Sequence, residues 1–233
     1  MKVSKKLIKK AFQRDDLDPA FVAELRRLLN EYGDAAKIDT PIRLTRFLAQ
    51  AVSETQIKKS DKPRLRENLN YSAKGLKGIS SYFRKHPKQA DRYGRTKDHK
   101  ANQKAIANLM YADKNRPKRL RLGNVWAGDG WAFRGAGLFQ TTGRSNMQKD
   151  LKTVEKLFGI SAINPQTKQP YKGILDNYTM FIMLGMAHWY RTKMWKLNST
   201  NAITDKINAG LPKKLKRQRL ATAKRIARLV FDA

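Results

Sequence analysis

The sequence predicts a mainly α-helical fold, and two observations lead to this expectation. Apolar residues recur at spacings of three and four residues through most of the chain, whereas alternating apolar and polar runs are scarce. Residues that start and stop helices also lie where this periodicity begins and ends. We therefore expect helices throughout, with at most a small hairpin.

Two helices are predicted near the N-terminus. Asp18 and Pro19 are typical of a helix start, and Gly33 follows the last apolar residue of that helix. Thr40 as N-cap, followed by a proline, opens the second helix, which should end near Glu54. We expect residues 1–35 to form a basic segment and a first helix, packed on a main body of residues 36–233.

The rest of the chain continues the helical pattern with one interruption. Further helices are predicted from residue 72 to about 83, over 101–112, from 142, over 178–190, over 199–208 and over 213–233. Residues 115–137 are rich in glycine, basic and aromatic residues and lack a helical period. This segment should be a long irregular loop or a short hairpin, a kind of segment that often carries function.

Composition restricts the partners and the site types. The formal net charge of +31 favours a polyanion: nucleic acid, an anionic membrane, or the bacterial envelope. There is no cysteine, and the three histidines are scattered, so we expect no disulfide, no metal and no cofactor. The N-terminus lacks the apolar core of a secretory signal, and the apolar stretch 178–190 is too short to span a bilayer.

Two of the nineteen acidic residues stand out as a candidate carboxylate pair. Glu54 follows an apolar run at a helix end, so it should lie at the edge of the core. Glu67 comes thirteen residues later, beyond a turn that could bring it to face Glu54. Cleavage of a glycosidic bond needs two carboxyl groups. An ion pair with Arg66 or a helix-capping role explains Glu67 equally well.

The residues 128–146, GDGWAFRGAGLFQTTGRSN, resemble the signature of family 19 glycoside hydrolases, which include plant-type chitinases and phage endolysins. Further similar stretches follow in the family's order: FLAQAVSET at 47–55, RENLNYSA at 66–73, NLMYADKNR at 108–116 and INAG at 207–210. Together they cover roughly residues 40–220, and the resemblance is greatest to the phage endolysins.

The resemblance implies a lysozyme-like α-helical fold with a substrate cleft between two lobes. It also implies an inverting mechanism, with Glu54 as general acid, Glu67 as general base and the hydroxyl of Thr142 holding the attacking water. Residues expected to bind substrate are Tyr71, Trp131, Phe133, Arg134, Gln140, Asn146, Asn208 and Arg217. The chain departs from the family pattern at Ser53, where a histidine is usual, and at Ala136, where an arginine is usual.

Among the family's substrates, the charge and the absence of cysteines favour bacterial peptidoglycan over chitin. An endolysin of this kind would wait in the host cytoplasm without a signal peptide and reach the periplasm and cell wall through a holin. It would act as a monomer on glycan strands, and its basic termini could contact lipopolysaccharide or a membrane surface. The alternatives are a chitinase, a nucleic-acid-binding protein and an inactive glycan-binding protein. No sequence-specific nucleic-acid motif is present, so we expect no specific nucleic-acid partner.

Overall fold

Helices account for most of the structure, a computed structural model that describes residues 2–55, 57 and 61–231. The α-helices in these ranges are α1 (Lys5–Phe12), α2 (Pro19–Tyr32), α3 (Pro41–Thr55), α4 (Ala73–Ile79), α5 (Ser81–Lys85), α6 (Pro87–Tyr93), α7 (Gln103–Met110), α8 (Asp129–Ala132), α9 (Arg144–Phe158), α10 (Tyr178–Arg191), α11 (Thr200–Asn208) and α12 (Lys213–Phe231). Extended pairing within these ranges is limited to isolated bridges, such as the one between Arg66 and Ala136. The prediction of a mainly α-helical fold is confirmed.

The first two predicted helix starts are confirmed. The carboxylate of Asp18 accepts a hydrogen bond from the backbone N–H of Ala20 at the start of α2. The hydroxyl of Thr40 accepts from the N–H of Arg43 in the first turn of α3. Glu54 is the last residue but one of α3, as expected.

Two predictions in the middle of the chain were wrong. The helix expected to run to residue 83 is divided at Ser80, whose N–H donates to Leu76 at the end of α4 and whose hydroxyl caps α5. The connection expected after it contains α6, which begins at Pro87 in the favoured first position. The irregular segment 115–137 contains the single turn α8 and the short 3-10 helix Lys118–Leu120, and another 3-10 helix, Asp113–Asn115, ends at its first residue.

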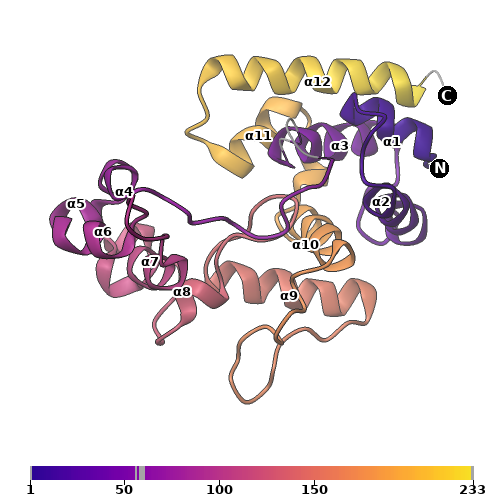
Figure 1. The fold of residues 1–233 in the computed structure, drawn as a ribbon. Helices are drawn as coiled ribbons and strands as arrows, with labels where there is room; N and C mark the ends of the chain where they lie inside the picture. Colours follow the sequence, from indigo (N-terminus) through magenta and orange to yellow (C-terminus); the bar gives the residue numbers. More distant parts are fainter. Residues whose placement is uncertain (1, 56, 58–60, 232–233) are drawn as a thin grey trace.

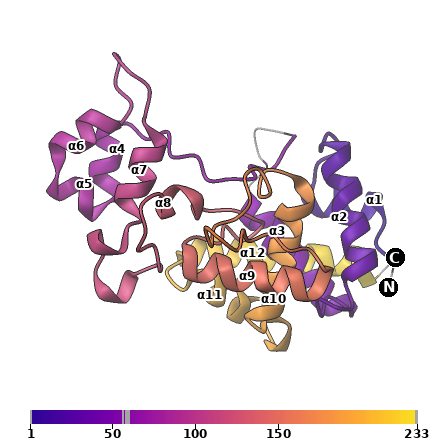
Figure 2. The ribbon, with the colours of Figure 1, turned by 90° about the horizontal axis from the view of Figure 1, so that it is seen from below.

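Two hydrophobic cores divide the molecule into two lobes. The large core joins α1, α2, α3, α9, α10 and α12. The small core is formed by Leu69, Leu76, Phe83, Ala90, Ile106, Ala107 and Met110. Figure 1 shows α4 to α7, with α8 beside α7, apart from the helices of the large core, and an extended segment leads to them after α3. Figure 2 shows the same separation, with α1 and α2 at the opposite end. Residues 1–35 thus hold two helices, and both belong to the large core.

The C-terminal helix α12 lies along α3 and beside α1 (Figure 1). Its buried face carries Arg219, Ala223 and Ile226. Arg225 donates a 2.7 Å hydrogen bond to the backbone carbonyl of Lys10 in α1. The expected amphipathic helix is therefore packed on the body, although its predicted last two residues, 232 and 233, lie outside the described residues. No helix among those described combines the length and apolar character needed to cross a membrane.

Candidate active site

Glu54 lies at the C-terminal end of α3 and forms an ion pair with α12. Its Oε1 is 2.5 Å from Nη2 of Arg219, and only 17% of the Glu54 side chain and 8% of the Arg219 side chain are exposed. Water therefore screens this pair poorly, so the attraction is stronger than that of a surface pair. The expectation that Glu54 lies at the edge of the core is met.

Gln50 holds the other side of Arg219. This glutamine lies one turn before Glu54 on α3, is fully buried, and accepts a 2.9 Å hydrogen bond from Nη1 of Arg219. Its Nε2 in turn donates to the hydroxyl of Thr204 on α11 at 3.0 Å. Three helices thus fix the position of the guanidinium group beside Glu54.

The arginine that pairs with Glu54 is Arg219 and not Arg217, whose expected contact with substrate stays a prediction. Arg217 is exposed, whereas Arg219 faces α3. Two residues along an α-helix turn a side chain by about 200°, so these two arginines point to opposite sides of α12. Arg219 shares a face with Ala223 and Ile226, at spacings of four and seven residues. This spacing was the signal in the sequence that Arg219 belongs to the buried face of the helix.

Glu67 is bound on both carboxylate oxygens. The hydroxyl of Tyr111 donates a 2.6 Å hydrogen bond to Oε1, and the N–H of Gly135 donates to Oε2 at 3.2 Å. The N–H of Glu67 donates back to the carbonyl of Gly135 at 2.8 Å. Burial, followed by the charge and hydrogen bond of Glu67, raises the pKa of Tyr111, so this phenol remains a neutral donor. Sequence reasoning did not identify Tyr111.

Thr142 and Gln140 lie around the same glycine as Glu67. A methyl group added to Gly135 would be 2.8 Å from Oε1 of Gln140, 3.2 Å from Cβ of Glu67 and 3.3 Å from Oγ1 of Thr142. The hydroxyl of Thr142 also donates to the carbonyl of Gln140 at 3.1 Å. The structure therefore brings together three of the predicted residues, Glu67, Gln140 and Thr142.

A buried carboxylate on α9 anchors the loop that carries Thr142. Asp150 on α9 is fully buried and accepts a 2.8 Å hydrogen bond from the hydroxyl of Thr141. It also pairs with His188 at 2.9 Å and with Arg191 at 2.5 Å, both on α10. Burial raises the pKa of Asp150, but the hydrogen bonds and charges of His188 and Arg191 outweigh burial, so the net shift is downward.

Two arginines border Glu67 on the other side. Arg134 stacks on the Trp131 ring, with Cζ 3.6 Å from the ring centroid, and donates to the Trp131 carbonyl at 2.8 Å. Arg66 donates to the Ala132 carbonyl at 3.0 Å. Burial, together with the charge of Arg134, lowers the pKa of Arg66 to about 10, while Asp176 and Glu67 oppose this shift. Arg134 and Trp131 thus lie near Glu67, and the guanidinium group of Arg134 covers one face of the Trp131 indole.

The prediction that Phe133 offers a face to a sugar was wrong. Phe133 is fully buried in the large core, with Arg144 4.6 Å above its ring. Aromatic residues beside glycines often serve packing, and this one does. Tyr71 is half-buried, and burial and the charge of Glu67 raise its pKa, which places it near the carboxylate. Asn146 and Asn208 are exposed, and among the described residues neither contacts Glu54 or Glu67.

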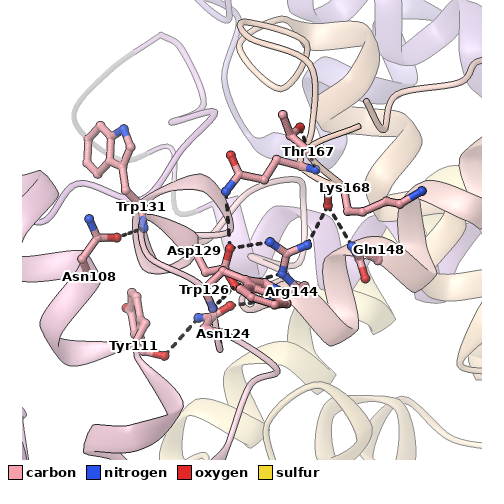
Figure 3. A network of polar contacts seen from close by, with 11 residues as sticks. Asn108, Tyr111, Asn124, Trp126, Asp129, Trp131, Arg144, Gln148, Thr167 and Lys168 are labelled. Carbon is pink, nitrogen blue, oxygen red and sulfur yellow. Dashed lines mark hydrogen bonds and ion pairs between the residues drawn. The ribbon is translucent and has the colours of Figure 1, made fainter. Parts of the chain in front are cut away.

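The acidic residue of the glycine-rich motif has a structural role (Figure 3). Asp129 is fully buried and pairs with Arg144, the arginine of the motif's second half, through bonds of 2.5 and 2.9 Å. It also accepts a 3.0 Å hydrogen bond from the N–H of Trp126. Asn124 links this pair to Tyr111. Its side chain accepts a hydrogen bond from the N–H of Arg144 and donates one to the carbonyl of Tyr111. A continuous network therefore runs from Asp129 to Glu67.

Comparison with known proteins gives one result for families and one for curated relatives. No family model matches the chain. A protein of Haemophilus influenzae, described as a glycosyl hydrolase family 19 domain-containing protein, is 33% identical over 151 residues, which are 64% of this chain. The matched part is 63% of that protein, so the chain spans less than two thirds of its relative's length. The chain is thus similar to a protein described as containing a family 19 glycosyl hydrolase domain.

Proposed function

We propose that this protein is a glycoside hydrolase that cleaves the β-1,4-linked glycan backbone of peptidoglycan by an inverting mechanism. Glu54 is the general acid and Glu67 the general base. The observation that carries the proposal is the arrangement of Glu67, Thr142 and Gln140 around Gly135. A carboxylate beside a hydroxyl and an amide is suited to hold and deprotonate a water molecule. The similarity of the chain to a protein described as containing a family 19 glycosyl hydrolase domain supports the same reaction class.

The reaction follows from the contacts of the two carboxylates. Tyr111 and the Gly135 N–H orient Glu67, which takes a proton as the water attacks the anomeric carbon. Glu54 gives its proton to the departing glycosidic oxygen, and Arg219 stabilises the carboxylate that remains. Inversion requires the two carboxyl groups to be about 6.5 to 9.5 Å apart, with the sugar and the water between them.

Charge supports peptidoglycan as the substrate. The net charge of +31 gives the protein a strong attraction for the anionic bacterial envelope. Chitin is uncharged and gains nothing from such a surface. We accordingly propose an endolysin role, in which a monomer degrades the cell wall after release from the host cytoplasm.

The stereochemistry of the product tests the mechanism. Proton NMR of a soluble glycan strand during digestion should show the α-anomer as the first product, because inversion converts a β-linkage into an α-hemiacetal. A first product in the β-configuration would contradict the proposed roles. Glu54→Gln and Glu67→Gln should each reduce kcat by about 100-fold or more. Mass spectrometry of the reducing ends would identify the bond cut, with MurNAc indicating a muramidase and GlcNAc a glucosaminidase.

Binding and cleavage assays on the same protein distinguish the alternative functions. Retention of DNA at physiological salt without cleavage of any glycan would favour a nucleic-acid-binding role. Oligosaccharide binding without turnover would favour an inactive glycan-binding protein. Faster cleavage of chitin than of peptidoglycan would favour a chitinase.

A further inference from the structure

A pocket on the small lobe is lined by Tyr111, the residue that binds the proposed general base Glu67. It has a volume of about 410 Å³ and lies between the α4–α5 corner and the segment that follows α7. This volume is in the range of small-ligand sites. Tyr71 and Tyr111 both line the pocket, and Tyr111 also binds Glu67 through its hydroxyl. Tyr111 therefore links the pocket to Glu67, the proposed general base.

The lining of this pocket is amphipathic and positively charged. Tyr71, Tyr82 and Tyr111 supply aromatic surface, while Ile79 and Leu120 are large apolar residues that remain about half exposed, at 54% and 48%. Large apolar side chains exposed around a pocket are typical of a surface that a ligand covers. The charged lining residues are Arg84 and Arg116, and no carboxylate lines the pocket.

Both arginines are held in place without being neutralised. Arg116 donates to the carbonyls of Leu120 and Met110, at 2.7 and 3.3 Å. Arg84 donates to the carbonyls of Lys77 and Gly78, at 3.3 and 3.4 Å. Within the described residues neither forms an ion pair, in contrast to Arg144, Arg191 and Arg219. Each guanidinium group therefore keeps its charge available for an external carboxylate.

We propose that this pocket binds the stem peptide of the glycan strand through its carboxylates. The proposal rests on the proposed function, and it identifies the substituent that distinguishes the substrate from chitin. A short peptide with free carboxylates supplies both the apolar contacts and the anionic groups that this lining requires. An unsubstituted acetamido sugar offers no charge to the two arginines.

The test compares three soluble substrates: uncrosslinked strands with stem peptides, the same strands after an amidase has removed the peptides, and a chitin hexasaccharide. The stripped strands keep the lactyl carboxylate and the hexasaccharide has none, so the three substrates separate the two possible anionic groups. The measured quantity is kcat/KM for stem-bearing strands divided by kcat/KM for stripped strands. In the double variant Arg84→Gln, Arg116→Gln this ratio should fall about tenfold, chiefly through KM.

A matched control removes two charges elsewhere on the same lobe. Lys88 and Lys97 are exposed and lie outside the pocket, so the double variant Lys88→Gln, Lys97→Gln should keep the wild-type ratio. The single variant Arg84→Gln should lower the ratio in the same direction and removes only an exposed side chain, so folding is retained. An unchanged ratio in the double arginine variant, or an equal fall in the lysine control, would overturn the proposal. Failure of the wild-type protein to cleave any of the substrates would instead refute the proposed function.

Discussion

The hydroxyl of Tyr111 donates a 2.6 Å hydrogen bond to Oε1 of Glu67, and the two residues are 44 positions apart in the chain. Tyr111 follows the last residue of α7 in the small lobe. The contact orients the carboxylate from the side opposite the Gly135 N–H, so each oxygen has its own donor. The proposed general base is thus positioned by both lobes.

Removal of the Tyr111 hydroxyl should impair catalysis more than folding. We expect Tyr111→Phe to lower kcat about tenfold, because the carboxylate loses a charge-assisted hydrogen bond and its fixed orientation. Initial rates on soluble glycan strands measure this effect. Tyr93→Phe is the control, since the Tyr93 hydroxyl makes no hydrogen bond within the described residues of the same lobe. Equal rates for Tyr111→Phe and wild type would remove this contact from the mechanism.

A methyl group at Gly135 should displace the residues that hold the water. Gly135→Ala places a carbon 2.8 Å from the Gln140 amide oxygen, the mobile end of a flexible side chain. The fold should therefore tolerate the change, while kcat falls by about 10- to 100-fold. Gly78→Ala is the matched control, because nothing lies within 4 Å of its added carbon. Loss of the folded state in Gly135→Ala, seen by circular dichroism, would contradict this expectation.

Substitutions of Arg217 and Arg219, which are two residues apart on α12, should differ sharply in effect. Arg219→Met leaves the carboxylate of Glu54 and the buried amide of Gln50 without their partner, and should lower the free energy of unfolding by about 3 kcal/mol. It should also reduce kcat, since the Glu54 carboxylate loses its stabilising charge. Arg217→Met changes an exposed side chain and should shift the free energy of unfolding by less than about 0.5 kcal/mol. Urea titrations of both variants test the difference, and equal stabilities would contradict it.

Acid should weaken the anchor of the Thr142 loop. Since the net effect on Asp150 is a lowered pKa in the folded state, its contribution is present above the unfolded pKa of about 4 and is lost as the pH falls through the folded value. Asp150→Asn should lower the free energy of unfolding at pH 7 by about 3 kcal/mol, because Arg191 and His188 lose their buried partner. The variant should then lose less stability than wild type between pH 5 and pH 2.

The control for this effect is a carboxylate on the surface. Asp91 pairs with Lys77, but 59% of its side chain is exposed. Asp91→Asn should therefore change the free energy of unfolding by less than about 1 kcal/mol, both at neutral and at acid pH. Parallel pH dependences for Asp150→Asn and wild type would show that Asp150 does not carry the acid sensitivity.

Local signals in the sequence were sufficient to predict the first long helices and the position of Glu54 at the end of one of them. The caps at Asp18 and Thr40 and the apolar run before Glu54 predicted α2, α3 and the place of the acid, because these features act within a few residues. Glu67 was a candidate from its position beyond a turn, but only the resemblance favoured a catalytic role over an ion pair or a helix cap. Its environment depends on Gly135, which is 68 residues away.

The errors arose where a residue's role depends on tertiary packing. Phe133 lies beside glycines in the motif, and only the packed structure places it beneath Arg144. Arg217 and Arg219 are both basic and only two positions apart, so helix register decides which one faces Glu54. Tyr111 and Gln50 act through contacts 44 and 169 positions away, and no local pattern marks them.

The burial of Asp129 against Arg144 changes what the glycine-rich signature reports about any chain that carries it. These two charged residues pair with each other in the interior, where the Asp129 side chain is fully buried. Loss of the pair should weaken the scaffold, whereas Glu54 and Glu67 are the residues that we propose to carry the reaction. An Asp–Arg pair kept within the signature therefore reports on the shape of the domain, and its reactivity must be judged separately at the two glutamates and at Gln140 and Thr142.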